Sequence, residues 1–402
     1  MMRPLEGVRV LSVEQYGAGP FGTQFLSDMG AEVIKVENPG DGGDMSRGVG
    51  PYFIKGAEDS TSASLFFQSF NRNKRSLTIN LRTEEGREVF HKLVAKVDGV
   101  CSNMRGDVPD KLGITYQHLK QFNPKLVCAH LSAYGRTGSR AAWPGYDYLM
   151  QAEAGYFSLT GEPGTAPARF GQSVVDMMTG LGLSYAFLCG LTQARATGEG
   201  RDIDVSLYDF ALFKLNYLAH WYMSDGHVQG REERSAHPSL TPCALYKTQD
   251  SWIYLMCNKE KFWPILCEKI GRPELGTDPR FVKFNNRLEN RGLVQEILDE
   301  SLQAKTTAEW LEVFAGNVPS APLMNVKEAV DNPFAHERGM IEHLTHQSGK
   351  EFSMLSTPIT LTGDEKVPST PGPELGDSTD DLLAEIGLNA AEIAALREKG
   401  AV

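Results

Sequence analysis

Long hydrophobic runs, paired cysteines and clusters of basic residues are all missing from this chain of 402 residues. No apolar run approaches the ~18 residues that a membrane-spanning helix needs, so we expect no membrane partner. The six cysteines are scattered without a CxxC pair, which argues against a metal site and against a disulfide framework. A formal net charge of −11, with no Lys/Arg run, argues against a nucleic-acid partner.

The first residues also lack the apolar core of a signal peptide. Together with the unpaired thiols, this absence predicts a cytoplasmic protein. The overall composition is that of an ordinary globular protein, with 41% hydrophobic and 23% charged residues. The length suffices for two or three domain-sized units with a large buried core.

The first half of the chain alternates predicted strands with predicted helices. Residues 8–13 and 31–37 are apolar runs typical of buried strands, and residues 23–29 between them have a helical pattern. A strand–helix–strand unit of this kind predicts parallel pairing, and the same rhythm continues to residue 207. We therefore predict an α/β fold with a doubly wound sheet. Composition then changes near residue 224, where a polar, glycine-containing stretch predicts an exposed connection.

A glycine-rich segment follows the first predicted strand. Residues 17–22 match the pattern GxGxxG, and Glu37 ends the second predicted strand, as in a dinucleotide-binding fingerprint. Three details weaken that interpretation: residues 14–16 intervene after the strand, Pro20 removes a backbone N–H, and the following helix opens with bulky Phe21. A turn that lets the backbone approach another group closely fits the pattern equally well.

Asp176 is an acidic residue in apolar surroundings, at the start of a long helical pattern of small and apolar residues. An unpaired buried charge costs several kcal/mol, so this carboxylate must be paired, hydrogen-bonded or functional. We interpret Asp176 as the working group of an enzyme. The structural alternative is that it serves as the N-cap of the helix that follows.

Eight short motifs occur in a characteristic order over nearly the whole chain. They are Leu5–Leu11, Ala18–Pro20, Gly30–Glu37, Asn73–Leu77, Pro144–Asp147, Gly198–Arg201, Asp278–Phe281 and Val318–Pro322. In this order they resemble the family III CoA-transferases, which have α-methylacyl-CoA racemases as relatives. The resemblance implies a large Rossmann-like domain built from both chain ends, a smaller α+β domain and an interlocked homodimer. We accordingly expect residues 1–223 and 346–402 in the large domain and residues 224–345 in the small one.

The resemblance also implies that Asp176 is the catalytic nucleophile. In such an enzyme a carboxylate attacks the donor thioester, and the resulting mixed anhydride is converted to an aspartyl-CoA thioester by the released CoA. The acceptor carboxylate then reverses these steps. Coenzyme A or acyl-CoA is thus a substrate, and neither a metal nor a permanently bound cofactor is expected.

Contacts with CoA are carried over from the family residue by residue. The positions implied are Gly17, Ala18, Arg82, Asn103, Met104, Arg105, Lys111, Tyr146 and Asp147. Family members with a glutamine at the position of Gly17 use it near the thioester, so here neighbouring Gln15 is the candidate substitute. Residues 235–239 stand where oxalate-using members have a shielding glycine-rich loop.

The loops 102–107 and 130–136 look most like those of members that use C4–C5 dicarboxylates, of the mesaconate, succinate, malate or itaconate type. A second carboxylate requires a cation. The candidates are Arg47, Arg105, Arg169 and His237. The sequence leaves open which of them binds substrate, and which acids are donor and acceptor.

Two other functions are alternatives. A racemase would pair Asp176 with a histidine base, whereas Tyr146, with an ordinary pKa of ~10, is a poor base at neutral pH. A non-catalytic acyl-CoA-binding protein would keep the basic positions without needing an acid at position 176.

Overall fold

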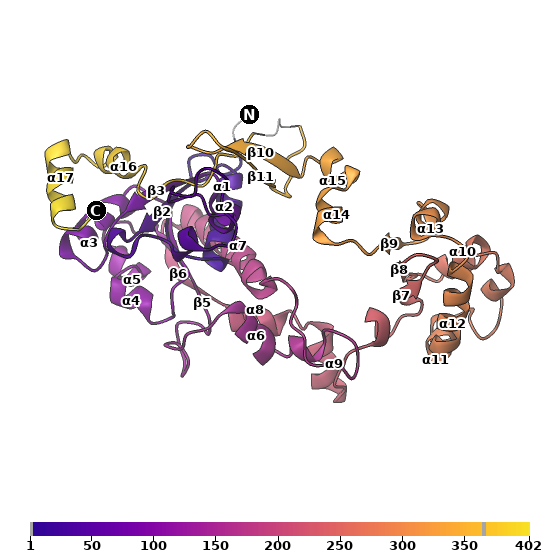
Figure 1. Ribbon diagram of the computed structural model, residues 1–402. Coiled ribbons are helices and arrows are strands. Elements are labelled where there is room, and N and C mark those ends of the chain that lie inside the picture. The colour runs from indigo at the N-terminus through magenta and orange to yellow at the C-terminus, as the bar shows by residue number, and fades with distance from the viewer. Residues whose placement is uncertain (1–2, 364–366) are drawn as a thin grey trace. The chain divides into compact units, whose positions relative to one another are not determined.

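The computed structural model describes residues 3–363 and 367–402, which form two compact units (Figure 1). Unit 1 comprises the described residues of Met1–Ala154, Gly171–Leu215 and Pro333–Val402. Unit 2 comprises Gly155–Phe170 and Asn216–Asn332. Segments from both ends of the chain therefore meet in unit 1. The division at residues 223/224 and 345/346 that we predicted from sequence stays a prediction.

A parallel sheet of six strands forms the centre of unit 1, with the order β3-β2-β1-β4-β5-β6. The strands are β1 (Arg9–Val13), β2 (Glu32–Glu37), β3 (Lys74–Thr78), β4 (Gly99–Ser102), β5 (Val127–Ser132) and β6 (Arg201–Ser206). This confirms the predicted α/β class. The strand order reverses between β1 and β4. In sheets of this kind, ligands bind in the crevice at the carboxyl ends of the two strands that flank the reversal.

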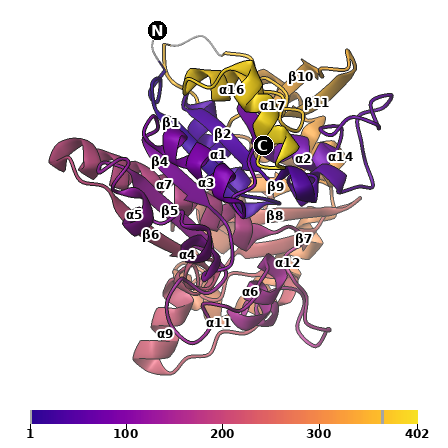
Figure 2. The same cartoon turned by 90° about the vertical axis from the view of Figure 1, so that its left-hand side faces the viewer.

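Helices cover both faces of this sheet. They are α1 (Ala18–Asp28), α2 (Leu65–Asn71), α3 (Glu84–Val94), α4 (Val108–Leu112), α5 (Tyr116–Leu119), α6 (Asp147–Glu153), α7 (Val174–Thr197), α8 (Leu207–Phe213), α15 (Pro333–Glu337), α16 (Thr379–Glu385) and α17 (Ala390–Glu398). A hairpin of β10 (Ile341–Thr345) and β11 (Glu351–Leu355) completes unit 1. Helices α16 and α17 lie beside α3 and the β2–β3 side of the sheet (Figures 1 and 2), and their Leu382, Leu383 and Ile393 join its core.

Helix α7 is the longest helix and packs against α1, β5 and β6. By length and composition this helix could cross a membrane. The sequence did not predict this, because glycines and other small residues interrupt the apolar pattern of the helix. Half of its most apolar window is nevertheless buried inside the protein, which is typical of a core helix.

Unit 2 contains a small antiparallel sheet with the order β7-β8-β9. Its strands are β7 (Cys243–Lys247), β8 (Trp252–Met256) and β9 (Ser320–Pro322), and its helices are α9 (Tyr217–Asp225), α10 (Phe262–Lys269), α11 (Phe284–Glu289), α12 (Arg291–Leu302), α13 (Thr307–Phe314) and α14 (Val326–Val330). Strands β7 and β8 form an antiparallel hairpin, and Thr306 and Glu309 form a capping box at the start of α13. A core around Trp263, Phe281 and Trp310 holds these elements together.

Candidate active site

Asp176 lies in the first turn of α7 and faces the start of α1. A Cβ atom placed on Gly17 would lie 3.3 Å from Oδ2 of Asp176. This proximity follows from contact between the two helix backbones: a Cβ on Gly22 would lie 2.4 Å from the carbonyl oxygen of Gly180, far inside van der Waals contact. The glycines thus allow the start of α1 to reach Asp176.

Asp147 caps α7 from a different helix. Its Oδ2 atom accepts hydrogen bonds from the backbone N–H groups of Val175 (2.7 Å) and Asp176 (2.9 Å), while its Oδ1 atom accepts one from the Gln151 amide (2.6 Å). Ser173 occupies the N-cap position without a side-chain hydrogen bond. The alternative that Asp176 is the N-cap is therefore wrong, and its side chain is available for another task.

The surroundings of Asp176 disfavour its charged form. Burial raises the pKa of this carboxyl to about 7, and the negative charge of Asp147 contributes in the same direction. A carboxyl group with a pKa near neutrality, at the edge of a cavity, is typical of a functional site.

A cavity of about 240 Å³ adjoins Asp176 at the carboxyl ends of the central strands, within unit 1. Its walls are the turn at residues 15–18, the segment 103–105 after β4 and the segment 143–146 before α6. The cavity brings together these predicted residues: Gln15, Gly17, Ala18, Asn103, Met104, Arg105, Tyr146 and Asp176. Asp147 is buried behind Asp176.

Asn103 fixes the turn rather than leaving its amide open to a ligand. Its Oδ1 atom accepts from the Gln15 N–H (2.8 Å), and its Nδ2 group donates to the Gln15 carbonyl (2.7 Å). A Cβ on Gly19 would lie 2.7 Å from the Cβ of Asn103, so this glycine is needed where α1 passes the segment after β4.

A second cavity of about 260 Å³ lies at the ends of β1, β2 and β3. Gln15 and Met104 line both cavities, so the two adjoin. Arg82 lines the second cavity with its side chain 72% exposed, 3.4 Å from Asp41. Lys111 binds Asp107 at 2.5 Å, and Arg105 binds the same carboxylate. These two cations hold the pKa of Asp107 well below its usual range.

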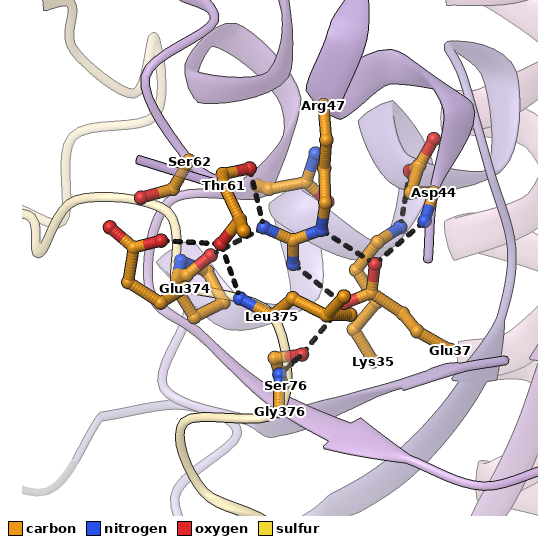
Figure 3. Close-up of polar contacts among 12 residues, drawn as sticks. Lys35, Glu37, Asp44, Arg47, Thr61, Ser62, Ser76, Glu374, Leu375 and Gly376 are labelled. Carbon is orange, nitrogen blue, oxygen red and sulfur yellow. Dashed lines mark hydrogen bonds and ion pairs between the residues drawn. The ribbon is translucent and has the colours of Figure 1, made fainter. Parts of the chain in front are cut away.

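Three of the residues predicted to bind substrate lie elsewhere. Arg47 is buried, and its guanidinium donates to both carboxylate oxygens of Glu37 at 2.8 and 2.6 Å (Figure 3). This pairing engages the guanidinium inside unit 1, and its role in binding a substrate carboxylate stays a prediction. Arg169 and His237 belong to unit 2, where Arg169 donates to the Phe170 carbonyl and His237 accepts from the N–H of Ser239. Their roles stay predictions.

The GxGxxG segment does not form a dinucleotide-binding turn. Helix α1 begins at Ala18, so Gly19 and Gly22 lie inside the helix and allow close packing. Glu37, the expected ribose ligand, is buried and bound to Arg47 and Ser76. The close-approach interpretation is the correct one.

Several residues of the cavity wall were not predicted from the sequence, namely Met45, Leu131, Trp143 and Leu207. Of these, Trp143 could have been found, since it directly precedes the Pro144–Asp147 motif. Leu131 lies in the loop 130–136, which was linked to the substrate without naming this residue, and Met45 and Leu207 come from segments with no motif of their own.

Cys128, His130 and Asp202 are a potential metal-binding group, with ligand atoms within 4.8 Å of one another. The His130 ring, however, is hydrogen-bonded on both sides, to Ser102 Oγ (2.8 Å) and Asp202 Oδ1 (3.1 Å). Burial also raises the pKa of the Cys128 thiol, which opposes the thiolate that a metal requires. This geometry favours a satisfied buried histidine.

Comparison with known proteins gives consistent matches over nearly the whole length of the chain. The profile of CoA-transferase family III matches residues 5–379. Acetyl-CoA:oxalate CoA-transferase from Acetobacter aceti is 34% identical over 392 residues, covering 97% of each chain. Succinyl-CoA:mesaconate CoA-transferase from Haloarcula marismortui is 31% identical over 393 residues, covering 96% of this chain and 98% of its own. The crystal structure of a CAIB/BAIF family protein from Brucella suis matches with a TM-score of 0.81 at 32% identity, covering 96% of this chain and 100% of that one.

Proposed function

Because this chain belongs to CoA-transferase family III, we propose that it moves CoA from an acyl-CoA to a carboxylic acid through a covalent intermediate on Asp176. The observation that carries this proposal is the position of Asp176, which is partly desolvated, has a pKa of about 7 and adjoins a cavity at the carboxyl ends of the sheet. Such a carboxyl is largely ionised just above neutral pH and remains a stronger nucleophile than an ordinary aspartate.

Each half-reaction is a pair of acyl substitutions in which electrons balance without a further reactant. A carboxylate oxygen of Asp176 bonds to the thioester carbonyl carbon, the C–S bond breaks, and CoA leaves as the thiolate. The thiolate then bonds to Cγ of Asp176, the bond between Cγ and the bridging anhydride oxygen breaks, and the donor acid leaves as a carboxylate that carries this oxygen. The acceptor acid repeats these steps in reverse, which frees acyl-CoA and Asp176.

The start of α1 is suited to stabilise the oxyanion that forms in each step. Gly17 provides no side-chain cap, and no acidic residue occupies the first turn of α1. The first backbone N–H groups of a helix lack partners within the helix. Gly17 and Ala18 line the cavity beside Asp176, so these groups can donate to developing negative charge there.

We propose that CoA extends from the Asp176 cavity into the adjoining cavity. The thioester would lie near Gly17, Ala18 and Tyr146, and the phosphates near Arg82 and Lys111. Exposed arginine and lysine side chains match phosphate charge, which supports this direction.

We further propose a C4–C5 dicarboxylate substrate. Similar proteins are named for oxalate, succinyl-CoA and mesaconate, all of them dicarboxylic acids or their thioesters. Of the four candidate cations, Arg105 is the one that lines the Asp176 cavity, where it binds Asp107 and can exchange this partner for a substrate carboxylate.

The test is mass spectrometry of the intact protein after mixing with succinyl-CoA, mesaconyl-CoA or acetyl-CoA, each with and without hydroxylamine. We expect an increase in mass by one CoA less water, mapped to the peptide that contains Asp176 and absent in Asp176→Ala. The dicarboxylic donors should label faster than acetyl-CoA. CoA binding without an adduct from any donor would contradict the covalent mechanism and favour a racemase or a binding protein.

We also propose that the enzyme is a homodimer. Six large apolar side chains on three neighbouring helices are exposed, which is unusual for a free surface. They are Tyr148 and Leu149 of α6, Leu181 and Tyr185 of α7, and Leu212 and Phe213 of α8.

Light scattering coupled to size-exclusion chromatography tests the homodimer. The wild-type protein should elute with the mass of two chains, and Tyr185→Glu with Phe213→Glu should shift it toward one chain. The control is Tyr52→Glu, an equally exposed position outside α6–α8. A monomeric wild-type protein would contradict the proposal.

A further inference from the structure

Six charged side chains are buried together under the turn at Tyr16 and Gly17. They form three pairs: Lys35 with Asp44 (2.7 Å), Lys74 with Glu14 (2.9 Å) and Arg47 with Glu37 (2.6 Å). Three positive and three negative charges balance. Buried ion pairs are a poor source of stability, because the cost of removing the ions from water cancels much of their attraction. We therefore ask which neighbouring groups these three pairs hold in place.

Asp44 connects this cluster to the turn. Its Oδ1 atom accepts from the Tyr16 N–H (2.9 Å) and the Ser46 N–H (2.8 Å), while its Oδ2 atom binds Lys35. Tyr16 has φ = 70°, a left-handed conformation that a bulky residue adopts only when its surroundings impose it. Asp44 is thus one of the groups that hold Tyr16 in this conformation.

Asp44 is itself held in place by Glu37 and Arg47. Its N–H donates to Glu37 Oε2 (2.8 Å), and Arg47 binds both oxygens of the same carboxylate. Ser76 donates to Glu37 Oε1 (2.6 Å). Figure 3 shows Arg47 at the centre of this arrangement, between Glu37 and Thr61.

The segment 373–376 completes the arrangement from the other end of the chain. Arg47 donates to the Pro373 carbonyl (2.9 Å), and the Gly376 N–H donates to Ser76 Oγ (2.8 Å). A continuous series of hydrogen bonds therefore runs from this segment through Glu37 to Asp44 (Figure 3). From Asp44 it continues to the Tyr16 N–H, in the turn beside Asp176.

We propose that Asp44 is a positioning residue for CoA transfer, which holds the Tyr16–Gly17 turn and the first N–H groups of α1 against the reacting carbonyl. Glu37 and Arg47 act through Asp44. The inference rests on the proposed reaction at Asp176. Its physical basis is the narrow tolerance of acyl transfer, in which displacing an oxyanion donor by about 1 Å costs on the order of 10²-fold in rate.

The test compares Asp44→Asn and Arg47→Lys with a matched buried ion pair. The control is Arg72→Lys, because Arg72 binds Asp28 at 2.5 Å at the other end of α1, with both side chains equally buried. For each variant we would measure the melting temperature, the affinity for CoA and the single-turnover rate of aspartyl-CoA formation.

We expect Asp44→Asn and Arg47→Lys to slow adduct formation by about 10²-fold while changing CoA affinity less than about threefold. Asp44→Glu should recover part of the rate. Arg72→Lys should lose comparable melting temperature with nearly the wild-type rate. If Asp44→Asn and Arg47→Lys react as fast as Arg72→Lys at similar stability, the inference is wrong. An absent adduct in the wild-type protein would instead refute the reaction itself.

Discussion

Asp176→Asn is expected to abolish CoA transfer and, at the same time, to make the folded protein more stable. The amide keeps the shape of the side chain but is a very weak nucleophile, so we expect kcat to fall by about 10³-fold or more and the aspartyl-CoA adduct to disappear. Loss of activity with a gain in stability would separate a chemical role from a structural one.

The gain in stability follows from the raised pKa of Asp176, which is about 7 in the folded protein against an ordinary 3.8. Below pH 3.8 the carboxyl is protonated in both states and has no effect. Between these two pH values the unfolded state releases its proton first, so the folded state loses relative stability as pH rises, and above pH 7 the loss is constant. As an order of magnitude, this loss of unfolding free energy reaches about 4 kcal/mol. Asp176→Asn should therefore be more stable than the wild-type protein by this amount at pH 8 and equally stable at pH 4.

Melting temperatures at pH 4, 6 and 8 test this expectation, with Asp59→Asn as a control on an exposed aspartate. The wild-type rate of adduct formation should rise with pH through about 7, because the carboxylate is the reactive form. A stability difference that does not depend on pH, or a rate that is flat between pH 5 and 8, would contradict the assignment.

Gly180→Ala is expected to damage both the fold and the site. A Cβ at this position would lie 2.4 Å from the carbonyl oxygen of Ala18, so α1 and α7 must separate. Overpacking of this kind typically costs about 1–3 kcal/mol in unfolding free energy. It would also move Gly17 away from Asp176, and we expect kcat to fall by about 10-fold or more.

The same substitution in an open helical position provides the control. Gly292 lies in α12 with nothing within 4 Å of an added Cβ, so Gly292→Ala should stabilise the protein by about 0.5–1 kcal/mol. Urea unfolding and steady-state kinetics would be measured for both variants. Wild-type stability and activity in Gly180→Ala would mean that close contact between α1 and α7 is not required.

The strands and the unusual aspartate could be predicted from sequence because their signals are local. Apolar runs identify β1 and β2 without knowledge of their neighbours, and Asp176 is conspicuous in an apolar helical pattern. The start of α1 could not be placed in this way. Glycines and a proline at residues 17–22 favour a turn, yet the segment is helical because its glycines pack against α7 and Asn103.

The role of Arg47 could not be predicted for a different reason. An arginine in a glycine-containing loop is usually solvated, and its burial depends on Glu37 and on the carbonyl of Pro373, which is 326 residues away. Likewise, nothing in the sequence around Asp44 reveals that its carboxylate binds the backbone of Tyr16.

The core of unit 1 is completed by α16 and α17 near the C-terminal end of the chain, so it cannot form fully until synthesis is nearly finished. Leu382, Leu383 and Ile393 of α16 and α17 belong to the same hydrophobic core as Leu11 near the start of the chain. A ribosome adding about 5–20 residues per second needs on the order of ten seconds or more to go from β6 to α17. During that interval the emerging sheet has an uncovered apolar face. Unit 2 can fold earlier, because most of it is the continuous segment Asn216–Asn332. Since the apolar face of the unit 1 sheet stays uncovered, we expect nascent chains to depend on chaperones until residues 379–402 emerge.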